Sequence, residues 1–402
     1  MGGFTASGIN YIKSESLSYN GNVDTSKFAR ISPQTHAALK RSQIQTGDIL
    51  YSIAGVNLGK CGIARAEMLP ANTNQAVAII RVDHARASAA FISYFLRSRL
   101  FVDQVLAGVA QSAQPNINLT DIGNFRVPAL SLREQQHLAA VLEPLDDKIE
   151  LNRRMNETLE AMAQAIFRDW FVDFGPVRRK LGGERDPVAI MGDLTPDPAR
   201  AAKLAALFPD ALNDAGLPAT WQHKTVGSVA EVFGGKQLHK SKIAEAGAVP
   251  VFGGAGLMGF TDEANASGFV ITVGRVGAYC GQFVTHNGEA WVNNNASRVK
   301  QKAGISGEWL VLALRQQDMQ VIRRGAAQPF VSNGDIERLT LVWPGADFLA
   351  CFQELVAPLF RRQEVAAKEN ATLAETRDYL LPRLMSGKVR VAEAAEAAEA
   401  AA

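Results

Sequence analysis

The sequence contains few cysteines and no long apolar run. Only three cysteines occur among 402 residues, and Cys61, Cys280 and Cys351 lie far apart without a Cys-x-x-Cys pair. This spacing argues against a disulfide framework or a local zinc site, and the six histidines are equally scattered, so we expect no metal bound by this chain. No apolar run approaches the roughly 18 residues that span a bilayer, and the first residues lack the apolar stretch of a signal peptide. The sequence therefore predicts a cytoplasmic protein with no membrane partner.

Familiar catalytic motifs are also missing. The sequence has no G-x-x-x-x-G-K-[ST] loop for ATP and no Asn-Pro-Pro-aromatic tetrapeptide of amino-methyltransferases. Residues 254–259 have the spacing G-x-G-x-x-G, but no helix is predicted to follow them and hold a phosphate, so a cofactor turn is not expected. Asp146, Asp147 and Glu150 fit a solvated helix face better than an acid–base pair. We therefore expect no catalytic residue and no cofactor bound by this chain.

The charge is unevenly distributed, although the net charge is only +2. Lys and Arg exceed Asp and Glu by 5 in residues 1–130 and by 3 in residues 221–345, whereas acidic residues are in excess by 4 in residues 131–220 and by 2 in residues 346–402. Two mildly basic blocks thus alternate with two acidic ones. This alternation is expected if the basic blocks face a polyanion and the acidic ones face solvent or protein.

An internal repeat organises the chain, because short identities recur at an offset of 214 residues. They are Gln114-Pro115 with Gln328-Pro329, Asp121-Ile122 with Asp335-Ile336, Pro144-Leu145 with Pro358-Leu359, and Asn156 and Leu159 with Asn370 and Leu373. At offsets of 219 to 220, Cys61-Gly62 aligns with Cys280-Gly281 and Asn74 with Asn294. The sequence therefore predicts two copies of one unit, each a basic β-rich block followed by a long helix.

Each basic block is predicted to be a mixed α/β domain. Apolar, β-branched runs separated by Gly and Asn predict strands, and the amphipathic stretches 89–100 and 309–315 predict short helices. We place the first domain at residues 1–130 and the second at residues 217–345. The second domain opens with residues 217–221, which have no counterpart in the first. Two explanations are open: a truncated first domain or a misplaced start codon.

The acidic blocks predict long helices in residues 131–175 and 346–391. Ser131 and Glu134 form a capping-box pattern that begins a first helical piece, and Pro144 is expected to end or kink it and to begin a longer helix. Because both copies carry the same 3-4 seam, the helices are predicted to pack as an antiparallel coiled coil related by a pseudo-twofold axis. The seam consists of Leu145, Ile149, Asn156, Leu159, Ile166, Leu359, Asn370, Leu373 and Leu380. Its two asparagines would fix the register, although they could also be ordinary surface residues.

Two further segments are less regular. Residues 176–216 are predicted to be a Gly/Pro-punctuated linker with some helix near residues 199–207. The basic triplet at residues 178–180 could contact phosphate, but a solvated charge run is the simpler interpretation. The Ala/Glu-rich residues 392–402 are expected to be a frayed helix or a disordered tail.

Several of these features resemble the specificity subunits of Type I restriction-modification systems. The resemblance rests on Val127-Pro128 and the run 132–136 leading into a long helix, the same arrangement after Trp343-Pro344, and the run 145–149. Residues 217–221 are similar to the usual opening of a target-recognition domain, and residues 274–281 to a turn within one. The resemblance implies two tandem target-recognition domains that each read half of a split DNA site. The helices would then act as a ruler: residues 144–171 span about 42 Å, close to one ~34 Å duplex turn.

The resemblance also implies partners. A non-catalytic chain would bind double-stranded DNA and dock two methyltransferase subunits, which bind S-adenosylmethionine and methylate adenine, together with a restriction/translocase subunit that uses ATP and Mg. The alternative is a protein-interaction scaffold with coiled-coil assembly and no sequence-specific DNA reading. The alternating charge favours the DNA reader, and a self-sufficient methyltransferase or nuclease would need the missing motifs.

Candidate DNA-contacting residues are basic or amide side chains in Gly-rich turns. Arg and Lys contact phosphate or guanine, and Asn and Gln pair with adenine edges. The candidates are Lys60, Arg65, Asn74, Gln111, Lys236, Lys240, Arg275, Asn294 and Gln328. The competing interpretation is that Asn builds these turns and Gln caps backbone groups.

Overall fold

The computed structural model describes residues 3–98, 101, 102, 105, 116–195, 197–325 and 328–401. It divides into two compact units. The first contains Met1–Arg154 and Ala366–Ala402, and the second contains Met155–Val365. The second unit is therefore one continuous stretch of chain, whereas the first is assembled from two.

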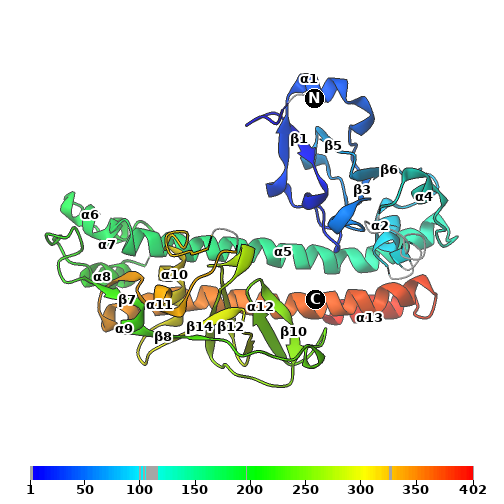
Figure 1. Ribbon diagram of the computed structural model, residues 1–402. Helices are drawn as coiled ribbons and strands as arrows, with labels where there is room; N and C mark the ends of the chain where they lie inside the picture. The colour runs from blue at the N-terminus through cyan, green and yellow to red at the C-terminus, as the bar shows by residue number, and fades with distance from the viewer. Residues whose placement is uncertain are drawn as a thin grey trace. The chain divides into compact units, whose positions relative to one another are not determined.

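Two three-stranded sheets form the first β-rich domain (Figure 1). Their strands are β1 (Ile9–Ile12), β2 (Ala29–Ile31), β3 (Ile49–Ser52), β4 (Cys61–Ile63), β5 (Ala71–Thr73) and β6 (Val77–Ile80). In the sheet β2-β1-β5, β1 is antiparallel to β2 and parallel to β5, whereas β4-β3-β6 is antiparallel throughout. β3 is buried on both faces: Ile49 and Tyr51 belong to one apolar cluster and Leu50 to another, as the two-residue period of a strand requires.

Three helices complete the described part of this domain: α1 (Pro33–Ala38), α2 (Ala89–Arg97) and α4 (Leu119–Asn124). Ser88 begins α2 by accepting a hydrogen bond from the backbone N–H of Phe91, and α4 begins with a capping box between Asn118 and Asp121. The inner face of α2 carries Phe91 and Phe95, which bury it against the cluster of β3.

The second β-rich domain has more strands. They are β7 (Gln222–Thr225), β8 (Ala230–Gly234), β9 (Val249–Gly253), β10 (Gly256–Thr261), β11 (Phe269–Gly274), β12 (Phe283–Asn287), β13 (Trp291–Val292), β14 (Ala296–Gln301) and β15 (Thr340–Trp343). They form the sheets β10-β9-β13 and β12-β11-β14-β8 and the antiparallel pair β15-β7. The helices of this domain are α9 (Val226–Val229), α10 (Gly307–Arg315) and α11 (Asn333–Glu337).

The two domains share one topology. The sheet β10-β9-β13 repeats β2-β1-β5, including its parallel pair, and β12-β11-β14 repeats β4-β3-β6. The second domain adds β7, α9 and β8, for which the described part of the first shows no counterpart. Consequently β14 is paired on both sides, whereas β6 pairs only with β3 in that part of the chain. Residues 126–129, which align with β15, form no strand there because they have no partner equivalent to β7.

Backbone hydrogen bonds correct two of the predicted sequence matches. The bond from Gly59 N to Ser52 O is repeated by the bond from Gly281 N to Gly274 O. Gly59 therefore corresponds to Gly281, and the match of Cys61-Gly62 with Cys280-Gly281 is wrong. Similarly, Val77 N bonds to Asn74 O as Ala296 N bonds to Asn293 O, so the counterpart of Asn74 is Asn293 and not Asn294.

Two helices of 40 residues each follow the domains: α5 (Leu132–Phe171) and α12 (Ala346–Met385). Both their starts and their ends differ by the offset of the sequence repeat. Of the two predicted effects of Pro144, an end or a kink, the end does not occur, because the helix continues through this residue. Proline removes one intrahelical hydrogen bond, and the burial of the neighbouring Leu142 and Leu145 keeps the backbone helical there.

The predicted antiparallel coiled coil is confirmed within each unit (Figure 1). In the first unit, Asn152 Nδ2 of α5 donates to Asn370 Oδ1 of α12 at 3.0 Å. In the second unit, Gln363 Nε2 donates to Asn156 O at 3.0 Å, and the Phe167 and Phe352 rings lie 6.1 Å apart. Pairing partners thus fall in number on one helix as they rise on the other.

The predicted seam residues lie on the inner side of the helices. Leu145, Ile166, Leu373 and Leu380 are buried, and Ile149, Asn156, Leu159, Leu359 and Asn370 are half-buried. Both seam asparagines bond across the pair, because Asn370 Nδ2 also donates to Ile149 O at 3.4 Å and Asn156 Nδ2 to Gln363 O at 3.4 Å. Their position agrees with a role in fixing the register.

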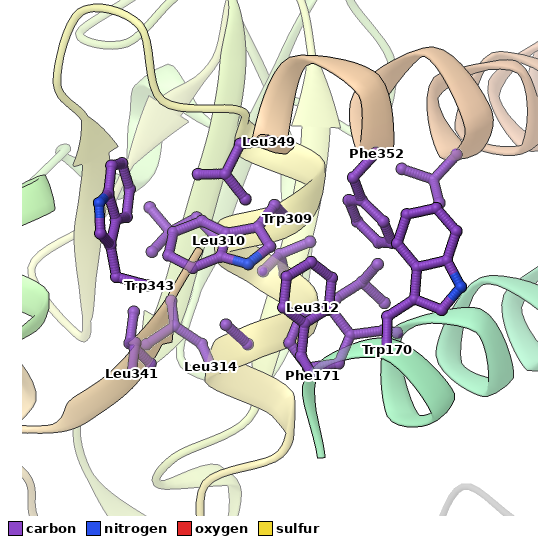
Figure 2. Packing of buried hydrophobic residues seen from close by; sticks show 14 of the residues in the cluster. Trp170, Phe171, Trp309, Leu310, Leu312, Leu314, Leu341, Trp343, Leu349 and Phe352 are labelled. Atoms are coloured by element: carbon purple, nitrogen blue, oxygen red, sulfur yellow. The ribbon is translucent and has the colours of Figure 1, made fainter. Parts of the chain in front are cut away.

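The connector in the second unit is folded. It contains α6 (Gly175–Leu181), α7 (Pro187–Ile190) and α8 (Pro198–Leu207), whose apolar faces join the core of this unit. Figure 2 shows the centre of that core, where Trp170 and Phe171 of α5 meet Phe352 of α12 and Trp309 of α10. Two members of the basic triplet are paired, because Arg179 pairs with Asp169 at 2.8 Å and Lys180 with Asp210 at 2.8 Å, whereas Arg178 is exposed. The helix predicted near residues 199–207 is present as α8, and two of the three basic residues are paired rather than solvated.

The Ala/Glu tail forms a helix, α13 (Val391–Ala401), in which Ala394 and Ala398 are buried. These two residues are four apart and lie on one helix face, so the segment is ordered against the first unit's apolar cluster. Among the residues that the structure describes, no helix combines the length and the apolar character required to cross a membrane.

Candidate nucleic-acid interface

In the second domain, strand pairing gathers several of the predicted residues at one place. Gly235 N donates to Ala296 O at 2.9 Å, and Lys236 N donates to Val292 O at 2.9 Å. Arg275 N donates to Asn295 O at 3.0 Å. The ends of β8 and β11 therefore both adjoin the turn before β14, and they bring Lys236 and Arg275 close to Asn294 in that turn.

Glycines permit this close approach. A Cβ on Gly235 would lie 2.1 Å from Asn293 O, and one on Gly274 would lie 2.3 Å from Tyr279 O and 2.6 Å from Gly254 O. We call this place the glycine junction and define it by Gly235, Gly254 and Gly274. Gly254 begins the G-x-G-x-x-G run, and that run forms the β9–β10 hairpin with Gly256 at φ +101. In this run Gly256 therefore allows the turn, and Gly254 allows the close backbone contact.

An exposed turn leaves the junction after β11. It contains the 3-10 helix η7 (Gly277–Tyr279), and it is tied to the segment before α11 because Gly277 N donates to Pro329 O at 2.9 Å and Val331 N to Arg275 O at 2.9 Å. These bonds place Gln328 beside the turn. The same place exposes three apolar residues that sequence reasoning missed, Val276, Tyr279 and Phe330. The sequence indicated this turn only through its flanking glycines. The three apolar residues could not be recognised as exposed, because in a sequence they look the same as core residues.

The charged neighbours of this turn are mostly paired. Arg323 donates to Cys280 O, and Arg324 pairs with Asp335. Asp335 also closes a capping box with Ser332, whose hydroxyl donates to it at 2.6 Å and, with Arg338 and Arg324, lowers the pKa of Asp335. Lys240 is exposed on a 3-10 turn, and among the described residues no recorded hydrogen bond or ion pair links its side chain to the glycine junction.

The first domain presents the same backbone frame with other side chains. Ile117 N bonds to Ile53 O as Val331 N bonds to Arg275 O, so Ile53 takes the position of Arg275. The turn that follows contains η4 (Gly55–Asn57), and its Val56 is 93% exposed. The two domains therefore offer a similar exposed turn with different chemistry.

The predicted residues of the first domain are less clearly grouped. Lys60 Nζ donates to Asn57 Oδ1 at 2.8 Å and lies 5.5 Å from the Tyr19 ring, so it is at the exposed turn. Arg65 pairs with Asp147 of α5 at 3.8 Å, and Asn74 Oδ1 accepts from Ala76 N at 3.2 Å within its own turn. Gln111 lies outside the described residues.

The described residues show neither a metal site nor an activated cysteine. They contain no group of three or more His, Cys, Asp or Glu side chains placed to hold a metal ion. Burial raises the pKa of the Cys61 thiol to about 11, and it also raises the pKa of the Cys280 thiol. A thiol with a raised pKa is a poor nucleophile near neutral pH, so these cysteines fit structural roles.

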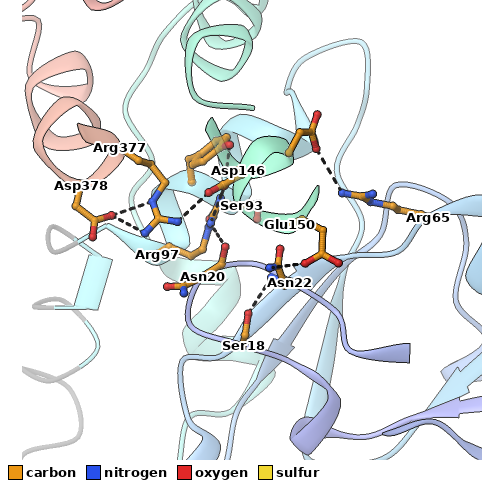
Figure 3. A network of polar contacts seen from close by, with 12 residues as sticks. Ser18, Asn20, Asn22, Arg65, Ser93, Arg97, Asp146, Glu150, Arg377 and Asp378 are labelled. Atoms are coloured by element: carbon orange, nitrogen blue, oxygen red, sulfur yellow. Dashed lines mark hydrogen bonds and ion pairs between the residues drawn. The ribbon is translucent and has the colours of Figure 1, made fainter. Parts of the chain in front are cut away.

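Both domains dock on equivalent glutamates of the long helices. Asn22 Nδ2 donates to Glu150 Oε2 at 3.1 Å in the first unit, and Asn287 Nδ2 donates to Glu364 Oε2 at 3.1 Å in the second. Glu150 and Glu364 are separated by the offset of the sequence repeat. Figure 3 shows the first of these contacts next to a larger ionic network around Asp146.

Comparisons with known proteins agree with this architecture. The family model "Type I restriction modification DNA specificity domain" matches residues 5–161 and 218–346, which is more than two thirds of the chain. The chain is 25% identical over 327 residues to the Type I restriction enzyme HindI specificity subunit of Haemophilus influenzae, covering 68% of this chain and 71% of that protein. It is 23% identical over 329 residues to the MjaIX specificity subunit of Methanocaldococcus jannaschii, covering 75% and 69%. The crystal structure of the Type I S subunit from M. genitalium has the same fold, with a TM-score of 0.51 at 18% identity over 95% of this chain and 90% of that one.

Proposed function

The chain belongs to the family of Type I restriction-modification DNA specificity subunits, and we propose that each of its β-rich domains is a target-recognition domain that reads one half of a split duplex site. In this role the protein selects the DNA sequence and directs partner subunits to methylate adenine or to cleave the DNA. Its own residues bind and position the duplex.

One observation carries this proposal: the same backbone frame presents an exposed turn in both domains, with different side chains at equivalent positions. Arg275 stands where the first domain has Ile53, and the exposed Val56 of the first turn stands where the second turn has Ala278. Guanidinium groups donate two hydrogen bonds to guanine, whereas apolar groups contact the thymine methyl. Two such domains are suited to reading two different half-sites.

Partner subunits would catalyse the methylation and the cleavage of DNA. We infer that two methyltransferase subunits dock on the helix pair and supply S-adenosylmethionine, and that a restriction/translocase subunit supplies ATP and Mg-dependent chemistry. The absence of ATP-loop and amino-methyltransferase motifs in the sequence supports this division. Each long helix of 40 residues spans about 60 Å, which leaves room for partners beyond the docked domains.

The test is co-expression with the methyltransferase subunits of the same restriction-modification system in a host without adenine methylation. Single-molecule sequencing then maps N6-methyladenine. Methylation at one split motif that requires this gene is the expected result. The variant Arg275→Ala should change preference in one half-site only. Lys203→Ala, at an exposed position of α8 that is not among the candidate DNA-contacting residues, is the control. A methylome that is the same with and without this chain would refute the proposal.

A further inference from the structure

A shared carboxylate joins the first target-recognition domain to both long helices (Figure 3). Asp146 of α5 accepts from Tyr94 Oη at 2.9 Å and from both terminal nitrogens of Arg97 at 3.2 Å, and these two residues lie on α2 of the domain. It also accepts from Arg377 Nη1 of α12 at 2.8 Å. Three of these bonds fall on Oδ2 and the bond from Arg377 falls on Oδ1, so each long helix and the domain share one carboxylate.

Each arginine of this network is held to its own element. Arg97 donates to the backbone carbonyls of Ser93 and Asn20, and its guanidinium lies 4.3 Å from the Tyr94 ring centroid. Arg377 pairs with Asp378 of the same helix at 2.8 Å. Asp146 accepts hydrogen bonds from both arginines and so connects α2 of the domain with α12.

The charged side chains of this network are largely buried, which strengthens their hydrogen bonds. The side chains of Arg97 and Arg377 are only 9% and 7% exposed, and that of Asp146 is 18% exposed. Charged hydrogen bonds are strong and directional in such surroundings. If the carboxylate loses its charge, Arg97 loses this anionic partner, and Arg377 keeps only Asp378 of its own helix. Neutralising Asp146 therefore removes the charged bonds that hold α2 to α12.

The second unit uses a different contact at this position. The counterpart of Asp146 is Phe360, whose ring lies 6.0 Å from that of Phe269. Apolar contacts give affinity without a preferred direction. Orientation of the first domain therefore depends more on polar contacts.

We propose that Asp146 fixes the orientation of the first target-recognition domain and thereby determines which spacing between the two half-sites the protein accepts. This inference rests on the proposed function. One extra base pair moves a half-site by about 3.4 Å and turns it by about 34° around the duplex axis. A domain held by directional bonds cannot follow that turn, whereas a domain held only by its apolar contacts can. Asp146 is thus a positioning residue that acts on DNA through the domain it holds.

The test measures methylation of duplexes with the native spacing and with one base pair more or fewer, using the full chain with its methyltransferase subunits. In Asp146→Asn, the ratio of the rates on native and shifted spacing should fall about tenfold or more, as a loss of about 1.4 kcal/mol of discrimination gives. The matched control is Asp147→Asn, an adjacent carboxylate that is 72% exposed and pairs only loosely with Arg65 at 3.8 Å. Its ratio should equal that of the wild type.

Other outcomes are equally informative. If Asp146→Asn slows methylation equally at all spacings, the residue has only a structural role and the inference is wrong. If Asp146→Asn does not fold, Tyr94→Phe removes one of the four bonds and keeps all the charges, and Arg97→Lys removes the forked geometry; unchanged ratios in both would overturn the inference. If the wild type methylates no split site, the proposed function fails instead.

Discussion

Replacing Gly235 with alanine is expected to open the glycine junction. The new Cβ would lie 2.1 Å from Asn293 O and 2.5 Å from Val292 O, both backbone atoms that cannot rotate away. Increasing the shorter distance from 2.1 Å to 3.0 Å requires about 0.9 Å of backbone movement. That movement separates the end of β8 from the turn before β14.

The cost follows from the hydrogen bonds beside the substitution. Gly235 N to Ala296 O and Lys236 N to Val292 O are each 2.9 Å long, and about 0.9 Å more takes both beyond hydrogen-bond range. At about 0.5–1.5 kcal/mol for each bond, the free energy of unfolding should fall by about 1–3 kcal/mol. Because Lys236 and Asn294 move apart, discrimination at one half-site should fall as well.

Urea unfolding followed by tryptophan fluorescence isolates this effect, because all five tryptophans lie within Met155–Val365. The matched control is Gly334→Ala on α11, where a new Cβ meets nothing closer than the Arg338 side chain at 3.6 Å. Alanine should stabilise that helix by up to about 1 kcal/mol. A Gly235→Ala variant within about 0.5 kcal/mol of this control, with an unchanged DNA preference, would show that the junction is not rigid.

Three further outcomes follow from the same structure. Arg275→Ala should cost about 1–3 kcal/mol of base discrimination in one half-site and leave the other unchanged, as measured with base-substituted duplexes; uniform weakening over all sequences would make Arg275 a phosphate contact. Trp170→Ala removes a fully buried ring that contacts Phe208 and Phe352, so circular dichroism during urea unfolding should show a loss of about 3–5 kcal/mol; a loss below about 1 kcal/mol would contradict the packing. The folded-state pKa of Asp335 is lowered, so its charge stabilises the protein above the ordinary carboxyl pKa of 3.8 and stops doing so as the pH falls through the lower folded value. Asp335→Asn should therefore be less stable than the wild type at pH 7 and approach it in acid, and a difference independent of pH would contradict that mechanism.

The helix pair was the part of the fold that the sequence predicted best. Its 3-4 seam is a local pattern, and Leu145 and Leu373 are buried where the pattern places them. The helix end, one of the two effects predicted at Pro144, does not occur for a tertiary reason: local rules count the lost hydrogen bond but not the buried leucines on either side of the proline. In the connector the sequence predicted only the helix near residues 199–207, because the apolar residues are spread over three short helices, and the other two are too short for a clear period.

The candidate interface could be predicted only in outline. Lys236, Arg275 and Asn294 were chosen one by one as polar residues in Gly-rich turns, and only strand pairing shows that they adjoin one junction. Arg65 has the same sequence context, but it faces Asp147 of α5. Long-range pairing decides between these cases, and a single sequence does not encode it in any short pattern.

The division of the chain has a consequence for inheritance. Met155–Val365 is one uninterrupted stretch that carries a complete reading domain together with the helical segments on which it rests. A gene exchange with both crossovers inside the helix-coding regions therefore replaces one half of the DNA preference as a cassette and leaves the core of the other unit whole. New specificities can arise by recombination between relatives, without a series of compensating point mutations.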